Sequence, residues 1–333
     1  MRHAHLTYPR MSSLVTAFVF CYDRNMANFQ SAYIDLCSSG QLSLRAEIAR
    51  EHELACDLCA RYCGIDRSER LGGCRTGMRA RVASYGPHHG EEDPLRGYGG
   101  SGTIFFAWCN LRCQYCQNHD ISQSAIGREV ESEELAEMML ELQHSGCHNI
   151  NFVSPSHVVA EILEALVIAA ERGLTVPLVY NTGGYDSIEA LRLLDNVIDI
   201  YMPDMKYSDR LVARRYSKIG NYPGVNRTAV KEMHRQVGDL IVDENGIALR
   251  GLLVRHLVLP GGLAGTTEIM RFLAGEISSN TYLNIMDQYR PAYKIYEDPL
   301  LYRPLQSEEY REAVEEARKF GLKRLDKRRS RRI

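Results

Sequence analysis

Short apolar runs alternate with amphipathic runs along most of the chain. Six apolar runs have the length and the bounding residues of buried strands, and helical patterns separate most of them. These runs lie near residues 103–107, 149–154, 176–181, 197–202, 252–258 and 281–286. Alternating strands and helices predict parallel strands joined by right-handed crossovers. Because there are six such units rather than eight, we predict an α/β fold in the form of an open or partial, TIM-like (βα)6 barrel.

Several helices are also predicted from apolar spacing. One has an apolar face that recurs at i, i+3, i+4 and i+7 between Ser132, the expected N-cap, and Gly146, the expected C-cap. That face consists of Leu135, Met138, Met139 and Leu142. Further helices are expected at 27–55, with a break at 38–40, at 158–167, and at 307–319.

Polar residues or glycines follow each predicted strand. In α/β barrels the chemistry gathers at the carboxyl ends of the strands, so these residues are expected to share one rim. The six strand ends begin at Cys109, Ser154, Asn181, Pro203, Pro260 and Asp287. The pattern therefore predicts a functional site at this rim.

Seven of the ten cysteines fall into two tight sets. The first is C-x2-C-x3-C-x10-C and the second is C-x3-C-x2-C. The sets are Cys56, Cys59, Cys63 and Cys74, then Cys109, Cys113 and Cys116. Thiolates are soft ligands that favour zinc and iron–sulfur clusters, and such close spacings suit a metal better than disulfides. We therefore expect a reducing, cytoplasmic compartment.

The two sets differ in the number of thiolate ligands that they offer to a metal centre. Three thiolates leave one iron of a 4Fe-4S cluster without a protein ligand, which favours chemistry over simple electron transfer. Four thiolates satisfy either a closed tetrahedral zinc site or a complete 4Fe-4S cluster. Spacing alone does not separate a second iron–sulfur cluster from zinc at Cys56 to Cys74.

The second set carries a resemblance to a known family. Cys109, Cys113 and Cys116, with Tyr115 before the last of them, resemble the signature of the radical S-adenosylmethionine (SAM) superfamily. The wider run from Gly100 to Asn118 resembles the predicted pyruvate formate-lyase activating enzyme group, over residues 27 to 300 or so. The resemblance implies a partial barrel and a 4Fe-4S cluster whose open iron is chelated by the methionine moiety of SAM.

The resemblance also implies an activity. The cluster would cleave SAM reductively, and the resulting 5′-deoxyadenosyl radical would remove a hydrogen atom from a substrate. By analogy the protein would activate a glycyl-radical enzyme, with a protein or peptide as substrate and a reduced flavodoxin- or ferredoxin-like electron donor. Two other hypotheses stay open: radical SAM modification of a small molecule or RNA, and a non-catalytic zinc-binding interaction module.

Residue contacts to the cofactor follow from the same resemblance. Asp204 and Lys206 match the Asp-x-Lys that contacts SAM in pyruvate formate-lyase activating enzymes, and Arg255 lies on a corresponding strand. The expected cofactor-binding residues are Tyr115, Ser154, Asn181, Asp204, Lys206 and Arg255. The chain departs from the family in two places: Ser154-Pro155 replaces a Gly-Gly-Glu run that holds the methionine amino group, and Ala60 replaces a proline.

Composition and charge limit the remaining possibilities. Of 333 residues, 45% are hydrophobic and 25% are charged, as in ordinary globular proteins. The formal net charge of −2 argues against a protein that coats nucleic acid, and no apolar run approaches the roughly eighteen residues of a membrane span. We expect four segments: a flexible arm or start-site extension (1–25), a helical and Cys-rich segment (26–98), the barrel (99–290), and a C-terminal helix with a basic tail (291–333).

The stretch 84–103 is rich in glycine and proline and is expected to be a connector. It contains a small group of polar candidates, namely His88, His89, Glu91 and Glu92. These residues would either bind a metal or line the mouth of the site, or they would lie in a solvated loop.

Overall fold

The computed structural model describes residues 29–296 and 298–326. By its internal contacts the chain divides into two units, residues 1–30 and residues 31–333. The expected arm at 1–25, together with Cys21, lies outside the described residues, and so does the end of the basic tail from residue 327. The sheet and the helices below all belong to the second unit.

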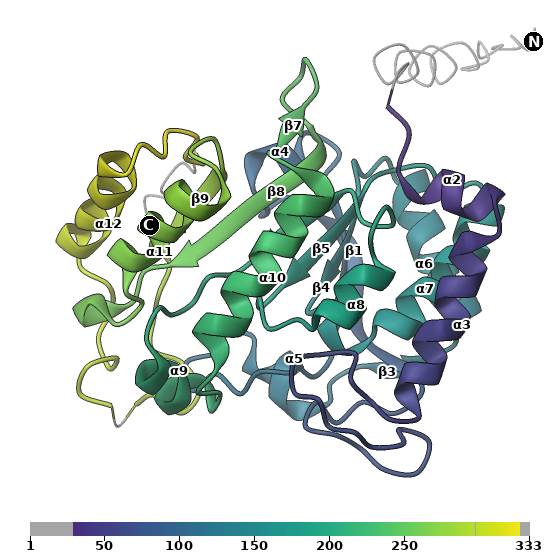
Figure 1. The fold of residues 1–333 in the computed structure, drawn as a ribbon, viewed down its shortest axis with the longest axis horizontal. Helices are drawn as coiled ribbons and strands as arrows, with labels where there is room; N and C mark the ends of the chain where they lie inside the picture. Colours follow the sequence, from purple (N-terminus) through teal and green to yellow (C-terminus); the bar gives the residue numbers. More distant parts are fainter. Residues whose placement is uncertain (1–28, 297, 327–333) are drawn as a thin grey trace, which may run out of the picture. The chain divides into compact units, whose positions relative to one another are not determined.

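Within the described residues, nine strands form one sheet (Figure 1). Its order is β3-β1-β2-β4-β5-β6-β8-β7, and β9 also pairs with β8. The strands are β1 (Ala80–His88), β2 (Ser101–Phe106), β3 (Arg128–Val130), β4 (Ile150–Val153), β5 (Leu178–Thr182), β6 (Ile200–Pro203), β7 (Ile241–Val242), β8 (Ala248–Leu257) and β9 (Tyr282–Met286). Strands β2, β4, β5, β6, β8 and β9 are parallel neighbours. These are the six predicted strands, so the open (βα)6 barrel is confirmed.

Strand β1 corrects the expected connector at 84–103. Its residues pair antiparallel with β2, from Val82 opposite Phe106 to His88 opposite Ser101. On its other side β1 pairs with β3 only through residues 80–82. Pro87, which has no N–H to donate, therefore lies where that side of β1 has no strand partner, a position that a sheet tolerates. The sheet thus begins before residue 99.

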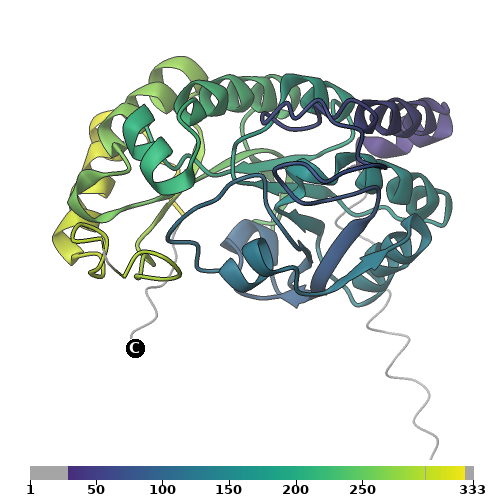
Figure 2. The ribbon, with the colours of Figure 1, turned by 90° about the horizontal axis from the view of Figure 1, so that it is seen from below.

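Most of the helices lie along the outer side of the curved sheet (Figure 2), but the short helix that carries Leu95 packs against the inner face. The helices have the following bounds. They are α2 (Tyr33–Ser38), α3 (Gln41–Glu53), α4 (Asp93–Arg96), α5 (His119–Ser124), α6 (Ser132–His144), α7 (Val159–Glu171), α8 (Ile188–Leu193), α9 (Arg210–Ser217), α10 (Tyr222–Val237), α11 (Thr266–Phe272) and α12 (Ser307–Lys319), with short turns η1 (Pro155–His157), η2 (Pro260–Gly262) and η3 (Leu273–Ile277). None of the helices in the described part of the chain is long and apolar enough to cross a membrane.

The helix boundaries test the sequence signals closely. The expected break at 38–40 is confirmed, since Gly40 separates α2 from α3 with a φ of 73°. The last helix also begins and ends where expected. Ser132 is not the N-cap of α6, because Glu131 holds that position. The carboxylate of Glu134 accepts a hydrogen bond from the backbone N–H of Glu131 at 3.0 Å, which satisfies a donor at the helix start.

The alternation of side chains along the strands positions the site. On the outer face, residues such as Phe152, Tyr180 and Leu283 join the main hydrophobic core with the helices. Successive side chains of a strand point to opposite faces, so their neighbours belong to the inner face. A small apolar cluster there contains Leu95, Val179, Ile200, Met202, Leu240, Ala248 and Leu253. Polar residues on the same face carry the candidate site.

Candidate active site

The C-x3-C-x2-C loop follows β2 and packs with buried aromatic residues. Cys113 is buried, and Cys109 and Cys116 are half-buried against the same cluster. Each sulfur lies next to a hydrogen-bonding group of the protein. The backbone N–H of Leu111 donates to Cys109 Sγ at 3.4 Å. Hydroxyls lie 2.9 Å from Cys113 Sγ (Ser217) and 3.2 Å from Cys116 Sγ (Ser122). Donors in such places suit thiolates.

The electrostatics of these thiols reflect burial and one nearby cation. Burial raises the pKa of Cys109 to about 12 and also raises the pKa of Cys113. The charge of Lys206 acts on both pKa values in the opposite direction. Three thiols of one short loop, with hydrogen-bond donors and a cation beside them, fit a 4Fe-4S cluster with one iron left open.

Four of the expected cofactor-binding residues form one network at the rim. Arg255 donates through Nη2 to Asn181 Oδ1 at 2.7 Å and through Nε to Asp204 Oδ1 at 3.0 Å. Lys206 Nζ donates to Asp204 Oδ2 at 2.6 Å. Burial would raise the pKa of Asp204, but the two cations outweigh it and hold that pKa below its ordinary value. Burial would lower the pKa of Lys206, but Asp204 reverses this and raises it.

Buried side chains of α10 hold the backbone of this rim. The hydroxyl of Tyr222 contacts the carbonyl oxygens of Gly183 and Asp204 at 2.9 and 3.0 Å. Asn226 Nδ2 donates to the carbonyls of Gly184 and Asp204, both at 3.0 Å. Gly184 has a φ of 74°, and a Cβ there would meet Asn226 Nδ2 at 2.2 Å. Glycine is therefore needed where α10 meets the loop after β5.

The two remaining expected residues occupy different positions. Tyr115 is buried and packs edge-on against Tyr207 and Tyr289, with ring centroids 6.3 and 5.9 Å away. Ser154 directly follows β4 and has a φ of 60°, a strained conformation for a residue with a side chain. Its backbone N–H donates to the carbonyl of Asn181 at 2.9 Å, which ties it to the rim. SAM contacts by all six expected residues stay predictions.

Three polar residues of the inner face were not assigned to the cofactor from the sequence. Glu92 Oε1 accepts a hydrogen bond from Asn284 Nδ2 at 2.6 Å. Among the described residues, the other oxygen of Glu92 and both amide atoms of Asn151 have no hydrogen-bond partner, although all are buried. The available signal was an asparagine inside an otherwise apolar strand, as in Ile-Asn-Phe-Val of β4. Buried polar groups of this kind usually have a partner, so Glu92 and Asn151 are candidates for contact with a bound molecule.

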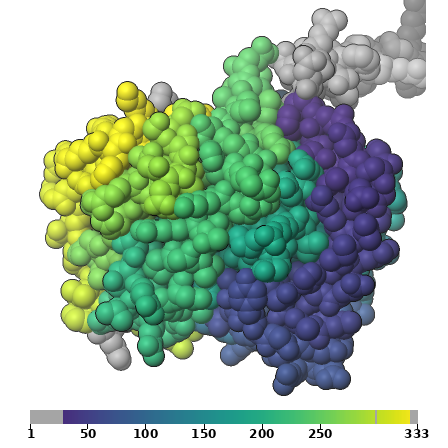
Figure 3. Space-filling model, in the orientation of Figure 1, coloured from purple at the N-terminus to yellow at the C-terminus, as the bar shows by residue number. Residues whose placement is uncertain are grey.

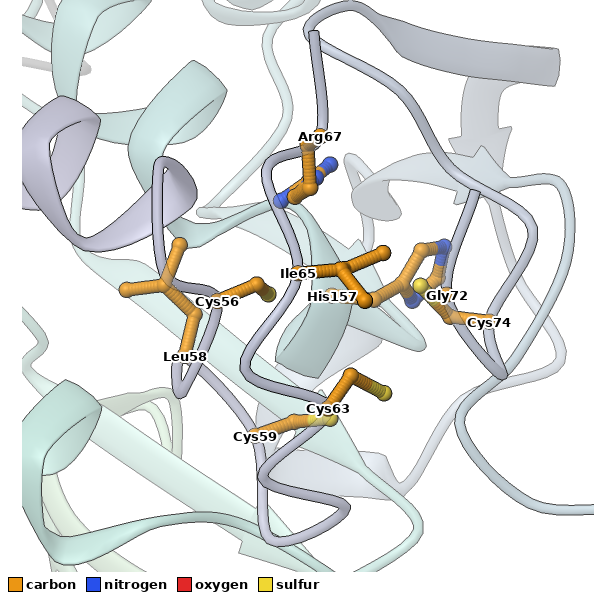
Figure 4. A pocket seen from close by; sticks show the side chains of 9 residues that line it. All are labelled: Cys56, Leu58, Cys59, Cys63, Ile65, Arg67, Gly72, Cys74 and His157. Atoms are coloured by element: carbon orange, nitrogen blue, oxygen red, sulfur yellow. The ribbon is translucent and has the colours of Figure 1, made fainter. Parts of the chain in front are cut away.

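The four N-terminal cysteines line one cavity together with Arg67 and His157 (Figure 4). Burial raises the pKa of Cys59 to about 12 and also raises that of Cys56. Across residues 29–296 and 298–326, no three histidine, cysteine, aspartate or glutamate side chains come close enough together to hold a single metal ion. The nine cysteines in the described part of the chain are all free thiols.

This N-terminal loop is bound to the C-x3-C-x2-C loop. Arg61 Nε donates to the carbonyl of Asn110 at 2.5 Å, and Arg112 Nη2 donates to the carbonyl of Gly73 at 2.6 Å. Ala60, the departure from the family proline, is buried in the same apolar cluster as Cys113. Figure 3 shows the first part of the described chain, purple to dark blue, at the surface beside the teal and green parts of the chain. The two cysteine loops therefore form one continuous region.

A partial barrel with three such thiols at its rim defines a class of cluster-dependent enzymes. The radical SAM superfamily model matches residues 103–261. The chain is also 32% identical over 304 residues to uncharacterized protein MJ0674 of Methanocaldococcus jannaschii, covering 89% of this chain and 83% of that one. This protein therefore belongs to the radical SAM superfamily, whose members use a 4Fe-4S cluster, SAM and an electron donor. That membership disfavours the non-catalytic zinc module.

Solved structures give weaker similarities. A structure of TYW1 with a lysine-pyruvate adduct bound has a TM-score of 0.41 at 12% identity, covering 65% of this chain and 73% of that chain. A radical SAM methyltransferase from Sphaerobacter thermophilus has a TM-score of 0.45 at 14% identity, with 69% and 66% covered. HydG, a maturase of the [FeFe]-hydrogenase, has a TM-score of 0.44 at 15% identity, with 66% and 48% covered.

Proposed function

We propose that this protein is a radical SAM enzyme that takes a hydrogen atom from a glycine of a protein substrate, as an activating enzyme does. Cys109, Cys113 and Cys116 would hold the cluster. When bound, the cluster and SAM would supply a 5′-deoxyadenosyl radical that removes the hydrogen atom. The free thiols at both cysteine sets suit a reducing, cytoplasmic compartment, and a flavodoxin- or ferredoxin-like protein would donate the electron.

The observation that carries this proposal is the network from Asn181 through Arg255 and Asp204 to Lys206. It presents two fixed cations at the rim, and Lys206 acts on the thiols of Cys109 and Cys113. A carboxylate such as that of the methionine moiety would be attracted to this position. Asp204 would fix both cations so that SAM is held in one orientation next to the open iron.

Aromatic residues around the loop would keep water and stray hydrogen donors from the reaction. Tyr115, Tyr207, Tyr222 and Tyr289 are buried in one cluster with Leu111 and Cys113. A dry, shaped cavity lets the protein protect a reactive radical. Tyr115 would offer its ring near the cluster or the adenine, as the family resemblance implies.

A first experiment tests the cofactor half of the proposal. The full-length protein is reconstituted anaerobically with iron and sulfide, reduced, and mixed with SAM. We expect 5′-deoxyadenosine release by the unaltered chain and its loss in Cys113→Ala, together with about four fewer irons, because the cluster loses a ligand. Cys37→Ser, which changes a cysteine outside both sets, should keep both signals. Unchanged iron and 5′-deoxyadenosine in Cys113→Ala would disprove the assignment.

A second experiment tests the substrate half with pyruvate formate-lyase as the probe protein. A glycyl-radical signal in electron paramagnetic resonance (EPR) should appear only when this protein, SAM, reductant and the probe protein are present together. SAM cleavage without any protein radical would reject the activating role with that partner.

A small-molecule substrate is the second candidate, and one observation favours it. Asn151 and Glu92 place unsatisfied donors and acceptors on the inner face of the barrel. Such groups would recognise a compact polar molecule that both donates and accepts hydrogen bonds. Faster 5′-deoxyadenosine release on addition of a small-molecule extract, and not of protein, would support this candidate over the activating role.

A further inference from the structure

The four N-terminal cysteines are organised as a binding site by their own loops. The backbone N–H of Cys56 donates to the carbonyl of Ile65 at 2.8 Å, and the N–H of Gly64 returns to the carbonyl of Cys56 at 2.9 Å. Gly72 lies so close to Cys63 that a Cβ there would meet its sulfur at 3.2 Å. These contacts fold the chain tightly round a cavity that the four cysteines line.

His157 provides an independent sign of a ligand in this cavity. The residue is 2% exposed, comes from the turn after β4, and lines the cavity with the cysteines (Figure 4). Its Nε2 lies 3.0 Å from the carbonyl of Ala107. A carbonyl can only accept, so in the neutral imidazole Nε2 carries the hydrogen and Nδ1 keeps its lone pair. Among the described residues, Nδ1 has no partner.

That arrangement is typical of histidines beside metals. A histidine that binds a metal through one ring nitrogen usually donates the other N–H to a carbonyl or carboxylate. Here the carbonyl partner is present and the other nitrogen belongs to a ring that lines a cavity with four thiols. Cavity, thiols and an unsatisfied buried nitrogen thus point to the same bound group.

The arrangement of the thiols favours a cluster over zinc. Tetrahedral zinc draws its four sulfurs to within about 3.8 Å of one another, from a Zn–S distance of about 2.3 Å. The four thiols line one cavity (Figure 4), and this arrangement suits a 4Fe-4S cluster because each of its irons takes one thiolate at a different corner.

We propose that Cys56, Cys59, Cys63 and Cys74 bind a second 4Fe-4S cluster, and that His157 contacts it through Nδ1. The site lies next to the first cluster motif, because Arg112 of that motif donates to Gly73, the neighbour of Cys74. The assignment does not depend on the proposed substrate. It also stands if the first motif proves inactive.

The test counts metal in full-length protein after anaerobic iron and sulfide reconstitution. A Cys109/Cys113/Cys116→Ala triple variant should retain about four irons and an EPR signal on reduction, with no SAM cleavage. A Cys56/Cys59→Ala variant should fall from about eight irons to about four, and the Cys37→Ser control should keep about eight. Circular dichroism of each variant checks that it folds.

Two outcomes would overturn the second cluster. One is a triple variant that binds one zinc and no iron, and the other is a Cys56/Cys59→Ala variant that keeps about eight irons. For His157, the variant His157→Gln in the triple-variant background should keep the iron but change the EPR g values. Identical g values would overturn the contact through Nδ1. Because the triple variant lacks the first motif, these results are independent of whether SAM is cleaved.

Discussion

Replacing Asp204 with asparagine tests whether the rim network is a buried charge network. Asp204 is shared by two cations, with Nε of Arg255 at 3.0 Å and Nζ of Lys206 at 2.6 Å. Asparagine keeps the shape but offers one acceptor oxygen in place of two. One cation would therefore face an NH2 group, and the charge of the three side chains would rise from +1 to +2, counting +1 for each cation and −1 for Asp204.

The magnitude follows from burial. The side chains are 14% (Asp204), 17% (Lys206) and 19% (Arg255) exposed, so water reaches them only in part. A hydrogen bond to a charged group contributes about 1.5–3 kcal/mol, and stranding one member of a buried pair costs about 3–5 kcal/mol. Partial exposure lowers the second figure, so we expect Asp204→Asn to lose about 2–4 kcal/mol. For a chain of this size that corresponds to a melting temperature about 3–6 °C lower.

The effect of Asp204→Asn on the free energy of unfolding should depend on pH in one direction. Because the cations hold the folded-state pKa of Asp204 below its ordinary value, its stabilisation is present above about pH 4 and is lost as pH falls through the folded pKa. The free energies of unfolding of the two proteins should therefore differ by a constant amount above about pH 4 and converge below it. Release of 5′-deoxyadenosine should fall at least about tenfold, since Lys206 and Arg255 lose their fixed positions.

The assay is urea unfolding of the full chain at several pH values, with Glu308→Gln as the matched control. Glu308 pairs with Arg311 on α12, where both side chains are about two-thirds exposed, at 65% and 67%. Water and salt screen such an exposed pair, so neutralising it should leave the free energy of unfolding almost unchanged. If Asp204→Asn destabilises the protein no more than Glu308→Gln does, the account of the rim as a buried charge network is wrong.

Three further changes test other parts of the site. Asn151→Val removes two buried amide atoms that have no partner among the described residues, so it should stabilise the protein by about 1–3 kcal/mol while lowering turnover; lower stability in thermal unfolding would argue for a hidden partner. Ser217→Ala removes a hydroxyl 2.9 Å from Cys113 Sγ and should make the cluster potential more negative in a redox titration, because hydrogen bonds to cluster sulfurs tune that potential; a shift in the opposite direction would contradict this. Burial lowers the pKa of His256 in the folded protein to about 4. Between about pH 6.5 and pH 4 the histidine is therefore protonated in the unfolded chain but neutral in the folded one. The free energy of unfolding should fall by about 3 kcal/mol over this range. In urea unfolding, the free energy of unfolding should fall less between pH 7 and pH 5 in His256→Gln than in the unaltered protein. An equal fall in both proteins would show that another group causes the effect.

The parallel strands could be predicted because each is a buried apolar run with turn residues at both ends. Their carboxyl ends must meet at one rim in a parallel sheet, so Asn181, Asp204 and Arg255 could be grouped from the order of the strands alone. Strand β1 could not be predicted in the same way. Gly86 and Pro87 interrupt it, and most of its later residues are not buried, so neither composition nor alternation indicates a strand.

Other parts of the site depend on contacts that spacing does not encode. Glu92 and Asn284 are 192 positions apart, yet they share a hydrogen bond inside the barrel. Arg67 reaches Glu161 across 94 positions, which joins the N-terminal cysteine loop to α7. A polar residue in a buried strand signals that it needs a partner, but only the packed fold identifies that partner.

The turn after β4 joins these observations. In many radical SAM proteins a Gly-Gly-Glu run at this position holds the methionine amino group. Here Ser156 contacts Thr182 Oγ1 at 3.0 Å, and His157 contacts the carbonyl of Ala107 and lines the cavity of the N-terminal cysteines. Two of the side chains after β4 are thus committed to contacts within the protein, and one of them faces the second cysteine set. Since Ser154 is strained at the end of the strand and linked to Asn181, the contact to the amino group would come from Ser154 or from the rim network itself. The turn after β4 therefore contacts both regions: Ser154 is bonded to the rim at Asn181, and His157 lines the cavity of the N-terminal cysteines.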